Sequence, residues 1–506
     1  MSESRKTKTI TGAKVYASKL QKEIEAVEEV GGIEEMQKRE GREKERERRM
    51  EEVTTTTKLK ELFYLLFPGV ENMRNLLSVT PVTNVIHKSY KFNVTHGVVS
   101  PNTDTLYGVA VCDLTSDTDM YIKIPETTRY YSLQFVDVWC HNFAYLFHTS
   151  EPGIYKLEYN PEPDPDPDNH TGNNLSDDDG TNVGSGNRYI GDKITGNSVN
   201  KLIKPIVGSI IKSPSKLCLI LCRVYANYYD EHDIKLAGDV LRDIIVSGKP
   251  TKNPIPKTEV NPKLTPLDVS YFLQRAKLLN SFQTIVPPES LDELIASDEL
   301  VSLCYIPFTQ GQSNIETTLL TPSPYIPHVN VSTSSTSSTS STIITKITKT
   351  GWKPISANSV DSNFEFAIVQ WQGLYANNYQ TSLYYFNNYD QNGNRYNGEH
   401  HSYYMILNKL PPAGSGAFWS INCYDINGHI AQNTNRVVVG TSSNIVKNKN
   451  DNKYTLYFLP VNSPLNNIYP KSNILTIPSS PCNFIMRVYS PTNYQYVPPI
   501  IRYFTK

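Results

Sequence analysis

The sequence predicts a mainly β protein with accessory helices (α+β). Two antiparallel β-sandwich or jelly-roll-like modules are expected to follow a charged N-terminal helical arm. Short segments rich in aromatic and β-branched residues recur along the chain between polar turns, which is typical of antiparallel sheets. A stretch rich in Ser and Thr, residues 328–345, divides these segments into two groups. Hydrophobic residues make up 39% of the 506 positions, enough to fill packed cores.

The first 56 residues form a region of their own. They contain KREGREKERERRMEE, in which basic and acidic residues alternate with almost no apolar residue between them. Leu20, Ile24 and Val27 form a short apolar stripe at helical spacing, which two glycines interrupt. We expect residues 1–56 to be a charged helical or disordered arm. A short coiled-coil tether is the alternative, although its seam is shorter than the roughly three to four heptads such a structure needs.

The first β module is expected over residues 57–300. The apolar pattern of residues 59–67 predicts a helix that Pro68 and Gly69 end. Residues 160–187 are rich in Pro, Asp, Gly and Asn and predict an acidic, disordered insertion, because no calcium-loop pattern is present there. Further helices are expected in DEHDIKLAGDVLRDIIV and LDVSYFLQRAKLLNSF. Strands are predicted at 105–112, 120–124, 130–137, 143–148 and 213–225.

The second β module is expected over residues 351–506, after a Ser/Thr-rich linker region at 301–350. Its first segment, DSNFEFAIVQWQGLY, has helical character. Few of its residues are charged, so its surface is expected to carry mainly amides and hydroxyls. Its predicted strands are SYYMILNKL, GAFWSINCYD, HIAQNTNRVVVG, KYTLYFLP and NFIMRVYS.

Charge and targeting patterns exclude several classes of protein. With 49 basic and 50 acidic residues the net charge is −1, which disfavours nucleic acid as a partner. No apolar segment follows MSESRKTKTI, and no run approaches the roughly 20 apolar residues of a membrane span. We therefore expect an intracellular protein or one packaged in a virus particle. Abundant Asn, Lys, Ile and Tyr resemble the composition of AT-rich genomes, including those of large DNA viruses.

The seven cysteines do not predict a disulfide framework. They are odd in number, widely scattered and without a C-x-x-C pair. Cys218 and Cys222 lie about 13 Å apart on a predicted strand, too far for a bond. We interpret the cysteines as buried and reduced.

The densest polar cluster within the β pattern is SPNTDTLYGVAVCDL. Asn102 and Asp104 precede a strand, where such side chains commonly bond their own turn backbone, and Tyr107 lies within that strand. If the strand ends converge, carboxylates and guanidiniums face each other, as in a site that binds an anion or polarises a carbonyl. A structural network of ion pairs and turn caps is the alternative. The candidate pocket comprises Asn102, Asp104, Tyr107, Arg129, Asp137 and Arg223.

Neither a metal nor a cofactor is predicted. His400 and His401 are adjacent, so on a strand they point to opposite faces and cannot share one ion. The sequence contains no H-E-x-x-H, phosphate loop, G-x-G-x-x-G or G-x-S-x-G pattern.

Tyrosines are unusually dense after residue 374. Tyr offers ring area together with a hydroxyl, so they are candidates for a face that binds a glycan or protein. Filling of core and sheet edge is the favoured interpretation. The residues are Tyr375, Tyr379, Tyr384, Tyr385, Tyr389 and Tyr396.

Two longer motifs resemble known families. VVSPNTDTLYGVAVCDL, followed by IPETTRYYSLQFVDVWCHNFAYLF, resembles the domain-of-unknown-function family numbered 1254. LPPAGSGAFWSINCYDINGHIAQNTNR, followed by NFIMRVYSPT, resembles the companion family numbered 1214. The resemblance implies a mainly β, two-module architecture and no particular reaction. The acidic insertion, the linker and the charged arm depart from the family pattern.

The resemblance also marks polar positions of each module. In the first it implies Asn102, Asp104, Thr105, Tyr107, Arg129, Asp137 and Arg223. In the second it implies Trp419, Tyr424, Asp425, Asn433, Arg436 and Arg487.

Two functions remain open at this stage. The favoured one is a binding, structural or assembly protein, including a virion component, which associates with itself or with a protein or glycan partner. The alternative is a hydrolase acting on a small polar or anionic substrate in the first module. In that case Asp104 or Asp137 is the acid or base, and Arg129 and Arg223 bind the anion.

Overall fold

The computed structural model describes residues 41–50, 57–58, 60–92, 100–115, 119–160, 210–256, 269–287, 291, 350–355, 363–426, 428–431 and 436–504. The chain divides into two compact units, Met1–Leu62 and Phe63–Lys506. In the first unit residues 41–50 are helical, and Glu45 bonds Arg48 at 3.1 Å and Arg49 at 3.0 Å. The other residues of the predicted arm lie outside the described part.

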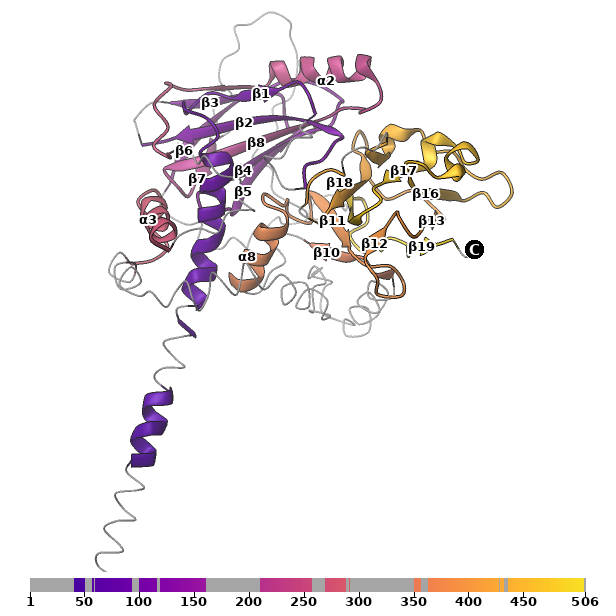
Figure 1. Cartoon of the computed structure of the whole chain (residues 1–506). Coiled ribbons are helices and arrows are strands. Elements are labelled where there is room, and N and C mark those ends of the chain that lie inside the picture. The colour runs from indigo at the N-terminus through magenta and orange to yellow at the C-terminus, as the bar shows by residue number, and fades with distance from the viewer. Residues whose placement is uncertain are drawn as a thin grey trace, which may run out of the picture. The chain divides into compact units, whose positions relative to one another are not determined.

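Two sheets form the first β module, which belongs to the second unit (Figure 1). Its inner sheet contains β1 (His87–Ser89), β2 (Thr105–Asp113), β8 (Leu217–Tyr225), β4 (Tyr131–Val136) and β5 (Asn142–Phe147), in that order. Its outer sheet contains β7 (Ile210–Ser213), β6 (Gly153–Tyr159), β3 (Met120–Ile124) and β9 (Ile245–Ser247).

One apolar core fills the first module. It joins alternate residues of the two sheets, such as Leu133 and Ile122, with Ala237 and Leu241 of helix α2 (Glu231–Asp243). Helix α2 begins after Asp230, whose side chain accepts hydrogen bonds from two backbone N–H groups of the first turn. Because both faces of β8 are covered, that strand is a nearly continuous apolar run.

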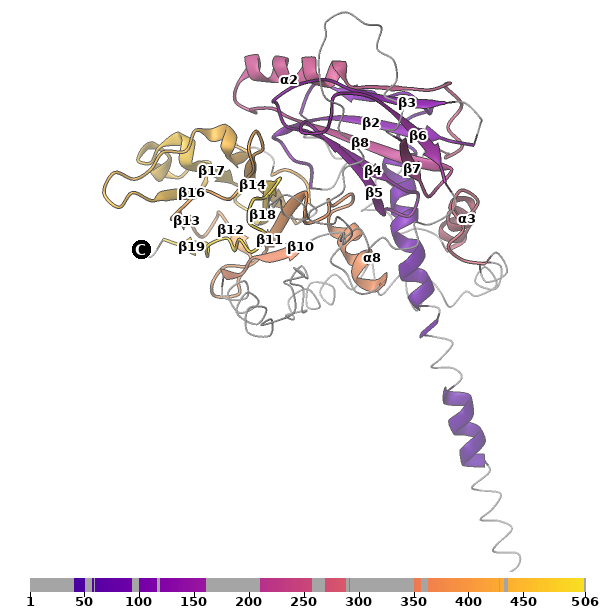
Figure 2. The ribbon, with the colours of Figure 1, turned by 180° about the vertical axis from the view of Figure 1, so that it is seen from behind.

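The second module repeats the two-sheet plan in the same unit (Figure 2). Its inner sheet contains β10 (Lys353–Ile355), β11 (Ser382–Asn387), β18 (Pro481–Tyr489), β14 (Trp419–Asp425) and β15 (Val438–Gly440), with β12 (Tyr396–Asn397) also paired to β18. Its outer sheet contains β17 (Ile474–Ile477), β16 (Tyr454–Pro460), β13 (Tyr403–Leu407) and β19 (Arg502–Tyr503). A second apolar core, including Met405, Ile421, Phe458 and Phe484, lies between these sheets.

A helical layer accompanies the sheets. The prediction that Pro68 and Gly69 end the first helix is wrong, because residues 63–72 are helical and lead into the π-helical turn η1 (Met73–Leu77). Phe63 stacks on Phe272 of α3 (Val269–Asn280) at 5.3 Å, and Phe67 contacts Trp371 of α8 (Asn363–Gln372) at 5.8 Å. Short 3-10 turns complete the second module: η3 (Thr441–Ser443), η4 (Pro464–Asn467) and η5 (Lys471–Asn473).

The predicted fold class, mainly β with accessory helices, is confirmed. The sequence did not indicate the two parallel pairs, β6 with β7 and β16 with β17. Within the segment HIAQNTNRVVVG only Val438–Gly440 forms a strand of the described part. The acidic insertion and nearly all of the linker region lie outside the described residues. Jelly-roll connectivity, a coiled coil and the module limits stay predictions.

The interpretation of cysteines as buried thiols is confirmed for the six in the described part, which are free and buried. Among the dense tyrosines, Tyr375, Tyr384, Tyr385 and Tyr396 are buried. Tyr379 and Tyr389 are partly exposed. The burial of four of the six agrees with core filling.

Candidate functional site: a polar layer between the two modules

One face of the inner sheet of the first module lies on the apolar core. The other face carries polar side chains beside buried apolar ones such as Leu219 and Leu221. Tyr107, Arg223 and Ser132 lie directly opposite one another on β2, β8 and β4, so their side chains share a face. Their sequence neighbours, such as Leu106 and Cys222, point the other way into the core. Register therefore gathers polar side chains that are far apart in the sequence.

The inner sheet of the second module is divided in the same way. Tyr384, Arg487 and Ser420 lie directly opposite one another on β11, β18 and β14. Met486 and Ile421 alternate with them and point into the second core.

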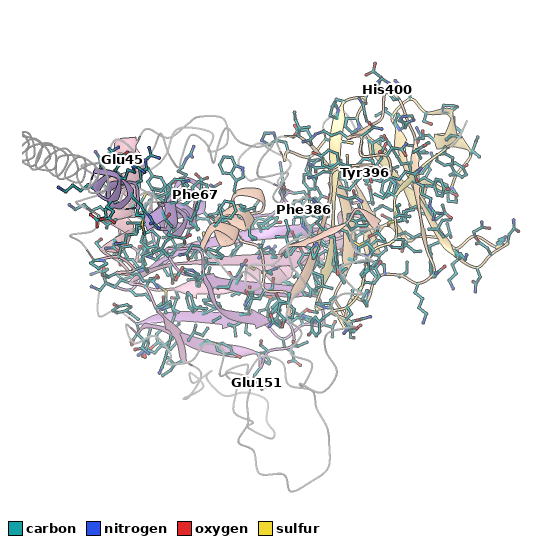
Figure 3. The ribbon with its side chains drawn as sticks, turned by 90° about the horizontal axis from the view of Figure 1, so that it is seen from below. Glu45, Phe67, Glu151, Phe386, Tyr396 and His400 are labelled. Carbon is teal, nitrogen blue, oxygen red and sulfur yellow. The ribbon has the colours of Figure 1, made fainter. Side chains whose placement is uncertain are left out.

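The two polar faces meet, and hydrogen bonds join them. The Asn102 side-chain amide donates to the Tyr489 hydroxyl at 3.0 Å, and the Asn422 amide donates to the Thr103 hydroxyl at 2.7 Å. Phe386, at the boundary of the modules in Figure 3, and Tyr228 of the first module pack against the same apolar cluster of the second module. We call this region the polar layer. Its members are Asn102, Thr103, Asp104, Thr105, Tyr107, Ser132, Gln134, Arg223, Asn377, Tyr384, Ser420, Asn422, Tyr424, Ser442, Arg487 and Tyr489.

Arg223 is buried in the polar layer and reaches the second module. Its Nη1 donates to Gln134 Oε1 at 2.6 Å and to Asn377 Oδ1 at 3.5 Å, and its Nη2 donates to the Tyr375 carbonyl at 3.1 Å. Tyr375 has a φ of 63°, in the left-handed region that a bulky residue seldom adopts.

Arg487 is the counterpart of Arg223. Its Nη1 donates to Tyr424 Oη at 2.8 Å and to Asn422 Oδ1 at 3.3 Å. Its Nη2 donates to the carbonyl of Ser100, in the first module, at 2.6 Å. Ser100 also has a left-handed φ, 53°. Each buried arginine thus donates to the backbone carbonyl of a residue in the other module whose φ lies in the left-handed region.

Neither guanidinium has a carboxylate partner within 4.0 Å in the described part of the chain, unlike the buried Arg74, which pairs with Glu71 at 2.8 Å. Burial lowers the pKa of Arg223 and of Arg487, but the surrounding tyrosine hydroxyls raise it more. Both side chains therefore keep their positive charge.

Three tyrosine hydroxyls of the layer accept hydrogen bonds. Tyr107 accepts from the Asn102 backbone N–H at 3.1 Å, Tyr489 from the Asn102 side chain, and Tyr384 from the Asn377 side chain at 2.8 Å. Among the described residues no group accepts a hydrogen bond from any of these three hydroxyls. By contrast, Tyr424 accepts from Arg487 and donates to the Pro101 carbonyl at 2.7 Å.

Asp104 supplies a carboxyl group to the layer. Its side chain is fully buried, and its Oδ1 accepts from the Ser442 hydroxyl at 2.8 Å. Its Oδ2 has no hydrogen-bond partner within 3.5 Å in the described structure. Burial raises its pKa to about 7, although Ser442, Ser420 and Arg487 act in the opposite direction. The carboxyl is therefore about half ionised near neutral pH.

Four of the six predicted site residues, Asn102, Asp104, Tyr107 and Arg223, lie together in the polar layer. The expected turn bond is present, since the Asp104 N–H donates to Asn102 Oδ1 at 3.0 Å. The resemblance alone marked Arg487 and Tyr424, and Thr105 has a buried hydroxyl without a partner in the described structure.

Arg129 and Asp137 are not brought together. They flank β4 at its opposite ends, more than about 20 Å apart at the rise of a strand. Arg129 pairs with Asp233 of α2 at 2.6 Å and lowers the pKa of that carboxyl. Asp137 Oδ1 accepts from the backbone N–H groups of Trp139 and His141 at 2.9 and 2.8 Å, which caps a turn. These contacts fix strand ends and local turns.

Sequence reasoning did not place Tyr489, Asn377, Asn422 and Ser442 in the site. It grouped Tyr384 with the dense tyrosines, for which core and edge filling was favoured over a binding face. The signal that could have found Tyr489 is its position two residues after Arg487, on the same face of the predicted strand NFIMRVYS. Asn377 and Ser442 lie outside the strands, and no periodic pattern indicates them.

Comparisons with known proteins agree with the two-module organisation. A family model described as protein of unknown function (DUF1254) matches residues 82–163, and one described as protein of unknown function (DUF1214) matches residues 381–493. These matches fall in the first and second modules. No curated protein matches.

Two solved structures are similar to this chain. One is a protein from Vibrio parahaemolyticus, with a TM-score of 0.52 and 15% identity over 89% of this chain and 100% of that chain. The other is a putative uncharacterized protein from Burkholderia cenocepacia, with a TM-score of 0.40, 10% identity and 89% coverage of both chains. The first likeness shows the fold alone. The comparisons do not support a viral origin.

Two kinds of feature are absent among the described residues. No helix among them has both the length and the apolar character that crossing a bilayer requires. No group of three His, Cys, Asp or Glu side chains among them is arranged to hold a metal ion.

Proposed function

We propose that this protein binds a small anionic ligand in the polar layer between its two modules. The observation that carries the proposal is the presence of two buried guanidiniums, Arg223 and Arg487, without a carboxylate partner in the described structure. Removing a charge from water costs several kcal/mol unless an opposite charge or a full set of hydrogen bonds compensates. A bound anion supplies that compensation.

A purely structural role accounts for only part of the geometry. Each guanidinium joins the two modules through a backbone carbonyl, and this contact stabilises their association. Apolar side chains at these positions stabilise an interface at least as well as buried charges do. The two charges are therefore better explained by recognition than by stability.

Thermal unfolding of the full chain tests the proposal. Phosphate, sulfate and a series of small carboxylates are added separately at constant ionic strength. At least one is expected to raise the melting temperature, because a ligand at about 100 times its Kd adds about 2.7 kcal/mol to stability. The variant R223Q is expected to lose this response.

R129Q is the matched control, because Arg129 lies outside the polar layer and is expected to leave the response intact. If no anion shifts the wild-type melting temperature, or if both variants respond like the wild type, the proposal is refuted.

A hydrolase acting on the bound anion is the second candidate function. Asp104 favours it, because a carboxyl with a pKa of about 7 suits an acid or base at neutral pH, and its Oδ2 has no partner in the described part. For an enzyme, D104N is expected to keep ligand binding and lose turnover. For a binding protein, D104N changes affinity only.

An assembly role, including a place in a virion, stays a prediction from the sequence. Size-exclusion chromatography with light scattering measures self-association directly: a monomer at all concentrations contradicts it.

The module limits of 57–300 and 351–506 also stay predictions. Because hydrogen bonds of the polar layer join the modules, we propose that they work as one unit.

A further inference from the structure

Two arginines and three tyrosines of the polar layer carry N–H and O–H groups that no described residue accepts. Asp104 Oδ2 and the hydroxyl oxygens of Thr105, Ser132 and Ser420 in the same layer also have no partner in the described structure. A guanidinium carries five N–H groups, and Arg223 and Arg487 each make three hydrogen bonds in the described structure. Two N–H groups therefore remain on each arginine. The hydroxyls of Tyr107, Tyr384 and Tyr489 add three O–H donors, which makes seven donors without an acceptor among the described residues.

These donors lie close together. Asn102 donates to both Tyr107 and Tyr489, so one residue holds both hydroxyls. Asn377 bonds both the Tyr384 hydroxyl and Arg223. The Tyr384 ring lies 6.0 Å from Cζ of Arg487. Tyr384 thus connects the surroundings of the two arginines.

Residual exposure is greatest at four of the five donor residues. Arg223, Arg487 and Tyr384 keep 6%, 5% and 9% of their surface, and Tyr107 is partly exposed. The amides that hold them, Asn102 and Asn377, are 2% and 1% exposed. Apart from Tyr489, which is 1% exposed, the donor residues are therefore the least covered members of the layer.

Charge sets the ligand class. Two guanidiniums give the layer a charge of +2, and Asp104, with its carboxyl about half ionised near neutral pH, offsets only part of it. A single carboxylate has two oxygens and about four acceptor positions, too few for seven donors. A phosphate-like group has more acceptor oxygens, and so does a pair of carboxylates.

We infer that the ligand is a dianion, either a phosphate- or sulfate-type group or a dicarboxylate, whose oxygens accept hydrogen bonds from both arginines and from the three tyrosine hydroxyls. This inference rests on the proposed binding function and specifies its ligand. Both ligand types present several anionic oxygens to the donors. They differ in the distance between their oxygens, so a compact probe and an extended probe distinguish them.

Calorimetric titration of the full chain near pH 7 and at constant ionic strength tests the inference with two matched pairs of probes. Sulfate is compared with methyl sulfate, and succinate with succinamate, so that each pair differs by one negative charge. In at least one pair the dianion is expected to bind roughly ten-fold or more tightly. Preference for sulfate indicates a compact oxyanion, and preference for succinate indicates a dicarboxylate.

Equal binding within both pairs overturns the dianion inference and leaves anion binding standing. Absence of binding by all four probes removes both the inference and the proposed function. The two failures are therefore distinguishable.

Two tyrosine variants test the contacts separately from folding. Y384F removes a hydroxyl whose proton has no acceptor in the described structure, and it is expected to weaken the preferred dianion roughly ten-fold. Y155F removes a hydroxyl that donates to the Glu151 carbonyl in the first core, outside the polar layer, and it is expected to change affinity by less than about two-fold. Equal losses in the two variants, or no loss in Y384F, contradict the assigned contacts.

Discussion

The two faces of each inner sheet are both buried, yet they differ in chemistry. On β8, Cys222 and Val224 point into an apolar core, and Arg223 between them points into the polar layer. On β18, Met486 and Val488 flank Arg487 in the same way. Burial of the core face stabilises the fold. Burial of the polar face costs free energy that the hydrogen bonds only partly offset.

Burial alone therefore does not identify the candidate binding site of this protein. On the core face the tyrosine hydroxyls have acceptors, as Tyr131 has the Pro125 carbonyl and Tyr396 has Asn387 Oδ1. The polar layer instead keeps donors without acceptors among the described residues and two carbonyls on left-handed residues, Ser100 and Tyr375. Proteins tolerate such local conflicts mainly at functional sites. Changes on the two faces are therefore expected to have different consequences.

The largest effect is expected on the core face. Phe484 is fully buried in the second core, so F484A loses apolar contacts and leaves a cavity. We expect the free energy of unfolding to fall by about 3–5 kcal/mol, measured by urea denaturation. A loss below about 1 kcal/mol would show that the two-sheet packing is wrong.

A pH-dependent effect is expected at Asp104. Burial raises the pKa of its carboxyl to about 7 in the folded protein, above the 3.8 of an exposed aspartate, so the folded state binds its proton more tightly. The resulting stability is complete below about pH 4 and is lost as the pH rises to about 7. D104N avoids this loss, so it is expected to exceed the wild type by up to about 4 kcal/mol above pH 8.

Denaturation curves of D104N and the wild type at several pH values check this difference. The two proteins are expected to converge as the pH falls toward 4. A gap that widens toward acid pH instead has the opposite sign and shows that Asp104 is stabilised as an anion.

A smaller effect on the unfolding free energy is expected for two tyrosines of the polar layer that differ in their hydrogen bonds, Tyr424 and Tyr384. The Tyr424 hydroxyl is bonded as donor and as acceptor, so Y424F leaves the Pro101 carbonyl and one Arg487 N–H without partners. We expect a loss of about 1–3 kcal/mol in unfolding free energy. Y384F removes one acceptor only and is expected to cost less than about 1 kcal/mol. Equal losses mean that both hydroxyls serve the fold.

The last prediction concerns the chemical reactivity of thiols in the two cores and involves no change in stability. The hydrogen bond with Cys218 and burial raise the pKa of the Cys112 thiol, and burial and Cys482 raise that of Cys423. Both thiols are therefore expected to resist alkylation at about pH 8 in the folded protein. Mass spectrometry after brief iodoacetamide treatment checks this, with urea-unfolded protein as the control. Rapid modification of either thiol in the native state contradicts its burial.

Much of the fold was predictable because it depends on local patterns. Aromatic and β-branched runs such as residues 217–225 predicted strands, and Asn102 with Asp104 predicted the turn that the structure contains. Parallel pairing of β6 with β7 was not predictable, because Ile210–Ser213 is brought beside β6 from across a long insertion. Pairing partners depend on contacts between distant segments, which periodicity does not encode.

Residue patterns predicted only those members of the candidate site that lie in the first module. The polar positions before and within β2 gave Asn102, Asp104 and Tyr107, and the end of β8 gave Arg223. Arg129 and Asp137 were grouped with them because strand ends often meet, but these two residues flank opposite ends of one strand. Arg487, Tyr384 and Tyr489 lie on the other module and join the site through the packing of two sheets.

The amino-acid sequence by itself determined many of the strand segments and which side chains alternate on each of them, because these follow from a two-residue period and local turn chemistry. Only the tertiary structure decided that the two polar faces meet, that each buried arginine reaches the other module, and that Asp104 is fully removed from water. The physical reason is that desolvation and hydrogen-bond pairing depend on neighbours in space. The strands that provide those neighbours here, β8 and β18, are separated by more than half of the chain.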